Sequence, residues 1–212
     1  MNITLFSQCS ILLPVLSGLL FYKKLSSPFK LLLAFYTLSI GVEYLALWLS
    51  ETYKNNMPLL HVFTAIEVSV YCYAFSSLFY GNRLFMLLCR AFIPIQFLIS
   101  IADISLVNGP MRFPTLARTL GAVFLVFLSL YQLYILFNQT NDQYLFKKGR
   151  FWLLFGVLTY FSIIIFFLLL MNLTVNKDPE TFQLIHDFHA GVNILCNFIF
   201  AYSFLCFRYR QD

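Results

Sequence analysis

The chain has 212 residues, of which 60% are hydrophobic, 19% are aromatic and only 11% are charged, and its formal net charge is +5. A soluble domain carries about 25% charged residues. The composition, with a mean hydropathy of +0.79, therefore excludes a chain exposed to water on all sides and indicates lipid as its main surroundings. The basic residues gather in the breaks between apolar runs, which argues against nucleic acid as a partner.

Seven apolar runs follow one another along the chain, each near the length of about 20 residues that a helix needs to cross a bilayer. We predict membrane-spanning helices at residues 5–22, 29–50, 58–80, 84–105, 114–137, 151–171 and 181–207. The runs are continuous rather than alternating, which favours helices over the strands of a barrel. The predicted fold is an all-α, seven-transmembrane helix bundle that forms one polytopic domain over residues 1–212.

Basic residues are distributed unevenly between the two sets of predicted loops. Ten of the fourteen fall in one set, namely Lys23, Lys24, Lys30, Arg83, Arg90, Lys147, Lys148, Arg150, Arg208 and Arg210. The other set holds Lys54, Arg112, Arg118 and Lys177. Because lysine and arginine are retained on the cytoplasmic side, we expect the N-terminus outside and the C-terminus in the cytoplasm. A chance imbalance, or a first helix broken at Pro14, would reverse one terminus.

Residues 59–65 resemble residues 184–190, and these two segments begin the third and the seventh predicted span. Nearly the same offset aligns Lys23-Lys24 with Lys147-Lys148. The pattern predicts a parallel repeat in which spans one to three correspond to spans five to seven and span four is the linker, a 3+1+3 arrangement. The alternative is a chance match, because apolar sequences align easily.

Polar and ionisable side chains inside the predicted spans are few, and such groups are functional candidates in a membrane protein. They are Glu43, His61, Glu67, Asp103, Arg118, His186, His189 and Asn193. On the predicted topology all of them lie in the outer half of the membrane. Several belong to stripes on one helix face: Tyr36, Ser39 and Glu43; Thr64, Glu67 and Tyr71; Gln96, Ser100 and Asp103; His186, His189, Asn193 and Asn197. We therefore predict an outward-facing polar pocket for a small ligand or cation.

A structural alternative stands beside each of these candidates. Glu43 and Glu67 could pair with Arg118, or with a histidine, and simply hold helices together. His61, Asp103 and Asp187 could lie in the interfacial region, where water is available.

Metal binding is the alternative function. His186 and His189 share a helix face, and His61 or a carboxylate such as Glu43 or Glu67 could complete a tetrahedral zinc site. An intramembrane hydrolase like those of the ceramidase and adiponectin-receptor superfamily would use such ligands, although its paired histidines lie four apart and these lie three apart. Outside this alternative no cofactor is expected. Retinal is excluded, because residues 181–207 contain no lysine for a Schiff base.

The leading hypothesis is a protein that is not an enzyme: a sensor, a small carrier (a transporter) or a subunit of a membrane complex. No long cytoplasmic segment is present in the sequence. A sensor would therefore pass its signal through a partner membrane protein or a homo-oligomer, whereas a carrier needs only its ligand and the lipid bilayer.

A resemblance covers most of the chain. It rests on Glu43, on Asn55-Asn56 followed by His61-x-Phe63-x-x-Ile66-Glu67, and on Arg150-Phe151-Trp152. These residues resemble those of a family of small, uncharacterised bacterial seven-helix membrane proteins. The resemblance implies a seven-helix fold and a multi-pass location in the bacterial inner membrane, and it implies no particular activity.

Overall fold

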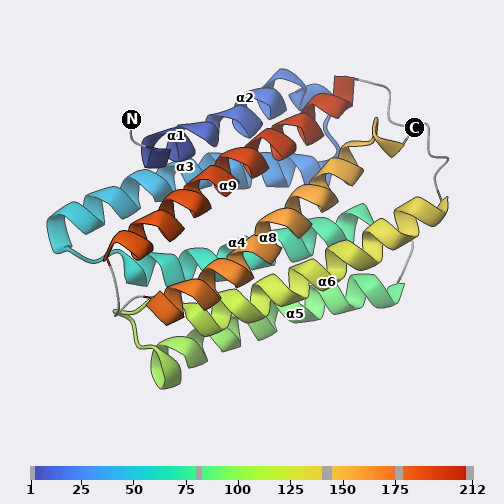
Figure 1. Cartoon of the computed structure of the whole chain (residues 1–212). Coiled ribbons are helices and arrows are strands. Elements are labelled where there is room, and N and C mark those ends of the chain that lie inside the picture. The colour runs from blue at the N-terminus through green and yellow to red at the C-terminus, as the bar shows by residue number, and fades with distance from the viewer. Residues whose placement is uncertain (1–2, 80–82, 140–144, 175–178, 209–212) are drawn as a thin grey trace. The chain divides into compact units, whose positions relative to one another are not determined.

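The structure is a computed structural model that describes residues 3–79, 83–139, 145–174 and 179–208. All regular secondary structure in these ranges is helical (Figure 1). The helices are α1 (Ile3–Ser10), α2 (Leu12–Leu20), η1 (Tyr22–Lys24), α3 (Ser27–Tyr53), α4 (Met57–Leu78), α5 (Arg83–Ala102), η2 (Asp103–Val107), α6 (Thr115–Gln139), α8 (Gly149–Thr174), α9 (Pro179–Leu205) and η3 (Cys206–Arg208).

Within the described residues, seven helical segments are long and apolar enough to cross a membrane, which confirms the predicted number of spans and indicates a multi-pass membrane protein. They are Ile3–Leu20, Ser27–Tyr53, Met57–Leu78, Arg83–Val107, Thr115–Asn138, Gly149–Leu170 and Gln183–Arg208. Their ends differ from the predicted ends by a few residues, as is usual for helix termini. Tyr80, the predicted end of the third span, and the basic residues Lys177 and Arg210 lie outside the described residues.

The first span is interrupted, and the interruption is local. α1 ends at Ser10, and α2 begins at Leu12 after one turn residue. Pro14 is the cause, since a proline ring clashes with the carbonyl group four residues earlier and offers no N–H to it. Beside the break, Ser10 donates its hydroxyl hydrogen to the Ser7 carbonyl at 2.6 Å. The segment still counts as one span.

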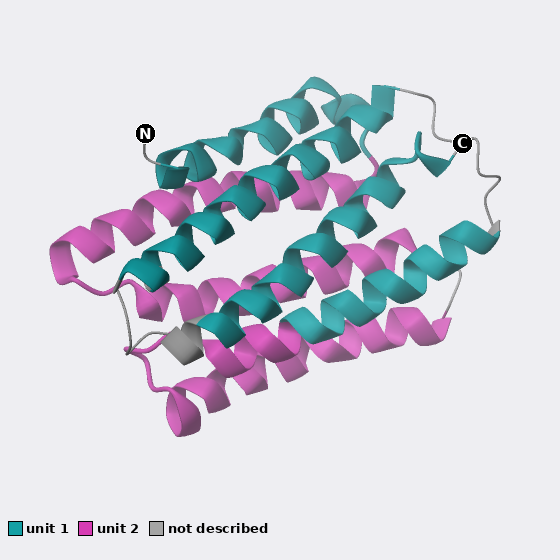
Figure 2. Cartoon of the chain, viewed as in Figure 1, with its two compact units in different colours: residues 1–25, 122–212 teal, residues 26–121 magenta. Residues whose placement is uncertain are grey.

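The described chain divides into two compact units, shown in Figure 2. Unit 2 comprises Ser26–Gly121, so it contains α3, α4, α5, η2 and the first residues of α6. α4 packs against both α3 and α5. Tyr36, early in α3, and Tyr71, late in α4, place their phenol oxygens 3.0 Å apart. The rings of Phe35 and Phe63 stack beside them, which fixes an antiparallel α3–α4 pair.

Unit 1 comprises Met1–Leu25 and Ala122–Asp212, and α9 is its central helix. Asn193 donates to the Ser7 hydroxyl at 2.9 Å and Asn197 donates to the Ser10 hydroxyl at 2.7 Å, so α1 and α9 run parallel. α8 runs antiparallel to α9, because Ser203 donates to the carbonyl of Gly149 at 2.7 Å.

These directions bring the end of α2, the start of α8 and the end of α9 to one end of unit 1 (Figure 1). Every lysine and arginine that the structure describes in unit 1 belongs to that end: Lys23, Lys24, Lys147, Lys148, Arg150 and Arg208. One-sided clustering of this kind is typical of the side of a membrane protein that is not translocated. The cytoplasmic identity of this end, the orientation of the termini and the 3+1+3 repeat stay predictions.

Candidate functional site

Five of the eight predicted site residues lie in unit 2, at the end formed by the C-terminal parts of α3 and α5 and the N-terminal parts of α4 and α6. Three polar residues of the predicted stripes are buried at the same end. We call the following set the polar cluster: His61, Thr64, Glu67, Gln96, Ser100, Asp103 and Arg118. All of its members except Arg118, which is half-buried, are buried.

His61, in the second turn of α4, is only 1% exposed. Its Nε2 lies 3.0 Å from the carbonyl oxygen of Arg112. Because a carbonyl oxygen can only accept, Nε2 carries the hydrogen, and Nδ1 is the buried nitrogen without a hydrogen-bond partner. This contact ties α4 to the loop between η2 and α6.

Asp103 is fully buried where α5 passes into η2, a π-helical turn. One of its carboxylate oxygens accepts the backbone N–H of Ala117 at 2.9 Å, and the other accepts a hydrogen bond from Asn108. The Asn108 amide also donates to the Thr115 hydroxyl at 2.7 Å. Asp103 therefore caps the start of α6, where unpaired N–H groups favour a negative charge. Asp103 thus has a structural role, but it is fully buried and does not lie in the water-accessible position that the alternative gave it.

Gln96 is fully buried on α5, and its amide orientation is fixed by one hydrogen bond. Nε2 donates to the carbonyl oxygen of Ala117 at 3.1 Å, so Oε1 is the amide atom left without a partner. A Cβ atom at Gly121 would lie 3.2 Å from that Oε1 and 2.6 Å from Cγ2 of Val68. Gly121 thus lets the start of α6, which belongs to unit 2, come close to both α4 and α5.

Glu67 is 4% exposed on α4, and its Oε2 has no hydrogen-bond partner. Desolvation is the largest influence on the ionisation of Glu67 and of Glu43 in α3, and the positive charge of Arg118 is the second. The Arg118 guanidinium carbon lies 5.6 Å from the centre of the Phe113 ring, a cation–π contact that helps to position it. Arg118 is thus the cation to which both carboxylates respond.

The other three predicted site residues belong to α9 in unit 1. Asn193 uses its amide in the hydrogen bond to Ser7, which is an interhelical tie. His189 packs against the Phe167 ring, with ring centres 4.4 Å apart. His186 is half-buried, and its Nδ1 has no hydrogen-bond partner.

Two buried polar residues of α6 in unit 1 were absent from the sequence-based candidates. Ser129 and Gln132 are 0% and 1% exposed, and neither the hydroxyl nor the two amide atoms has a hydrogen-bond partner. Their spacing of three residues inside an apolar run is the signal that could have identified them, since it places both on one helix face.

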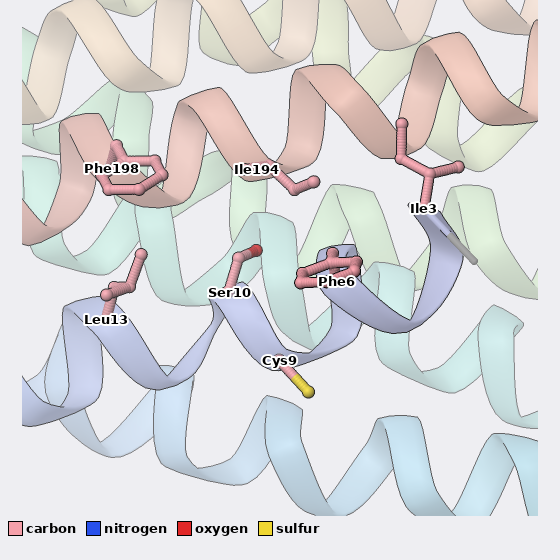
Figure 3. A pocket seen from close by; sticks show the side chains of 7 residues that line it. All are labelled: Ile3, Phe6, Cys9, Ser10, Leu13, Ile194 and Phe198. Carbon is pink, nitrogen blue, oxygen red and sulfur yellow. The ribbon is translucent and has the colours of Figure 1, made fainter. Parts of the chain in front are cut away.

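A groove of about 460 Å³ lies in unit 1 between α9 and the first span (Figure 3). Its lining comprises Ile3, Phe6, Cys9, Ser10, Leu13, Ile194 and Phe198. A second groove of about 330 Å³ in unit 2 is lined mainly by apolar side chains of α3, α4 and α5. Neither groove is lined by any of the eight predicted site residues, so neither is the predicted polar pocket.

No three histidine, cysteine, aspartate or glutamate side chains gather as metal ligands within residues 3–79, 83–139, 145–174 and 179–208. The zinc alternative built on His186, His189 and His61 therefore has no ligand set in the part of the chain that the structure describes. Of the five cysteines, Cys72, Cys89, Cys196 and Cys206 are buried and Cys9 is exposed.

No family model, no curated protein and no solved structure matches this chain. The resemblance to a small bacterial seven-helix family consequently stays a prediction.

Proposed function

We propose that this multi-pass membrane protein binds a small cation at the polar cluster of unit 2, with Glu67 as the group that attracts it. The observation that carries the proposal is the Glu67 carboxylate, which is buried in a membrane-spanning helix with one oxygen left without a hydrogen bond. A buried polar atom of this kind is costly unless something satisfies it.

Charge balance supports the same proposal. Two carboxylates, Glu43 and Glu67, respond to a single guanidinium, that of Arg118. When both carboxylates are ionised, this group of three carries one excess negative charge, which burial makes costly and a bound cation would neutralise. A charged side chain inside a bilayer is costly and is almost always paired. Asp103 is a separate carboxylate, and the N–H groups at the start of α6 favour its negative charge.

Binding of a cation suits a carrier, a sensor or a subunit of a membrane complex. A carrier needs no further partner, and it is the form we favour. The orientation predicted from the basic residues would open the cluster to the outside. No observation favours the metal-dependent hydrolase, so we do not propose it.

The test is the thermal unfolding of the purified full-length protein in lipid nanodiscs. The midpoint is measured in chloride salts of sodium, potassium, ammonium, tetramethylammonium and calcium, with ionic strength held constant by N-methylglucamine chloride. A ligand that binds the folded state raises the midpoint as its concentration rises. We expect at least one cation to do so in the wild type and not in Glu67→Gln. Glu51→Gln, an exposed carboxylate on α3, is the matched control and should behave as wild type.

A wild-type midpoint that no cation shifts would overturn the proposal. A double-mutant cycle then identifies the structural role: if Glu67 only pairs with Arg118, Arg118→Gln should restore part of the stability that Glu67→Gln removes. Where a cation does bind, its uptake into proteoliposomes separates a carrier from a sensor or a complex subunit.

A further inference from the structure

The contacts at Gly121 of α6 show how the polar residues of α4 and α5 are aligned along the axis of this helix pair. A Gly121 Cβ would lie close to Cγ2 of Val68 on α4 and to the terminal amide of Gln96 on α5, so these two side-chain groups meet at one height along the helix pair. α4 and α5 pack against each other and run in opposite directions (Figure 1). Moving one turn of about four residues along each helix therefore brings Thr64 level with Ser100.

Glu67 and Gln96 thus occupy one level, and Thr64 and Ser100 occupy the next. All four side chains are at most 5% exposed. Each has an oxygen atom that no hydrogen bond satisfies: Thr64 Oγ1, Glu67 Oε2, Gln96 Oε1 and Ser100 Oγ.

The hydroxyl groups of Thr64 and Ser100 differ from other helical hydroxyls of unit 2 in their hydrogen bonding. A helical serine or threonine often donates its hydroxyl hydrogen to the carbonyl four residues earlier. Thr37, Ser39 and Ser69 of unit 2 all do so, at 2.9, 2.9 and 2.7 Å. Thr64 and Ser100 do not, although both are more deeply buried than Thr37 and Ser69. Their oxygens are therefore available to another partner.

The chemistry of these oxygens defines that partner. A carboxylate, an amide carbonyl and two hydroxyls are hard ligands, the kind that alkali and alkaline-earth ions prefer over transition metals. The set contains one carboxylate, Glu67, whose charge a single monovalent ion balances. The Gln96 Nε2 bond to Ala117 keeps the carbonyl oxygen, rather than the amide nitrogen, as the free atom.

We infer that the cation of unit 2 is a dehydrated alkali-metal ion, sodium in the first instance, held by the oxygens of Thr64, Glu67, Gln96 and Ser100. This inference rests on the proposed function and narrows it from a small cation to an alkali ion with a named set of ligands. It uses no nitrogen or sulfur ligand, in contrast to the zinc alternative.

The experiment measures the apparent sodium affinity from the rise of the unfolding midpoint with sodium chloride concentration, in nanodiscs and at constant ionic strength. Thr64→Val and Ser100→Ala should each weaken sodium binding about tenfold, the change expected when one hydrogen-bonding or ligating group to a charge is lost. Thr37→Val and Ser69→Ala are matched controls, because they remove hydroxyls that already have partners. These two variants should keep the wild-type affinity.

Tetramethylammonium separates this inference of an alkali-ion site from the broader proposal of a cation site. If tetramethylammonium stabilises the protein through Glu67 and sodium does not, a cation site exists but the alkali-ion inference is wrong. If sodium binds through Glu67 with equal affinity in wild type, Thr64→Val and Ser100→Ala, the ligand set is wrong. A wild-type unfolding midpoint that no cation shifts would overturn both the alkali-ion inference and the proposed cation site. A variant that unfolds at the wild-type midpoint without sodium is correctly folded, so a loss of affinity in it reports the site.

Discussion

Asn197 of α9 donates a hydrogen bond of 2.7 Å to the hydroxyl of Ser10, which in turn donates to the carbonyl of Ser7. Both side chains are buried, at 4% and 7% exposed. The bond joins residues 187 positions apart in the chain. Because lipid is as apolar as the helix surfaces, such polar contacts and close packing hold membrane helices together in place of the hydrophobic effect.

The Asn197–Ser10 bond should carry measurable coupling energy. We expect the double-mutant cycle of Asn197→Leu and Ser10→Ala to give a coupling of about 0.6 to 1.7 kcal/mol, between the average and the largest value measured for interhelical hydrogen bonds in a membrane protein. The measurement is reversible unfolding in mixed detergent micelles. Ser17→Ala is the control, because that hydroxyl bonds only the Pro14 carbonyl of its own helix. Coupling between Ser17 and Asn197 as large as that of Ser10 would show that the effect is not the bond.

Gly121 should not tolerate a side chain. A Cβ there would lie 2.6 Å from Val68 Cγ2, and a helical valine has little rotamer freedom to move away. We expect Gly121→Ala to destabilise the protein by about 1–3 kcal/mol through overpacking.

The matched control for this substitution is Gly41→Ala in α3, where a Cβ would meet nothing within 4 Å. Gly41→Ala should instead stabilise the helix by about 0.5–1 kcal/mol. Adding Val68→Ala to Gly121→Ala should recover part of the loss. A Gly121→Ala protein as stable as wild type would mean that α6 does not approach α4 as described.

Asp103 should act as a cap rather than as a ligand-binding group. Asp103→Ala removes the acceptor of the Ala117 N–H and frees Asn108, so we expect a loss of about 1–2 kcal/mol in unfolding free energy, as for other helix caps. Ser105→Ala, in the exposed part of η2, serves as the control. Full stability of Asp103→Ala together with lost cation binding would place Asp103 in the site instead.

The orientation of the chain can be tested directly. The predicted topology places the C-terminus in the cytoplasm, so a fluorescent reporter fused after Arg210 should be active and a phosphatase that works only outside should be inactive. The reverse result would turn the molecule over. The polar cluster of unit 2 would then face the cytoplasm, while the cation chemistry of Glu67 would be unaffected.

The sequence alone was enough to predict a helical membrane protein and the positions of its spans. Hydropathy, length and turn residues identified all seven apolar helices to within a few residues, because a helix in lipid must satisfy its own backbone and be apolar around it. The stripes on α4 and α5 were also visible, since Thr64 with Glu67 and Gln96 with Ser100 follow helical spacing.

Tertiary structure decided which of those polar groups are already satisfied. Asp103, Asn193 and Glu67 are all polar residues within predicted spans. In the structure, however, Asp103 caps α6 and Asn193 joins α9 to α1. Those partners lie 14 and 186 residues away, and one helix's periodicity gives the face of a residue but not what packs on it. Glu67 keeps an unbonded oxygen only because α4, α5 and the start of α6 close around it, and that burial is a property of the packed helices.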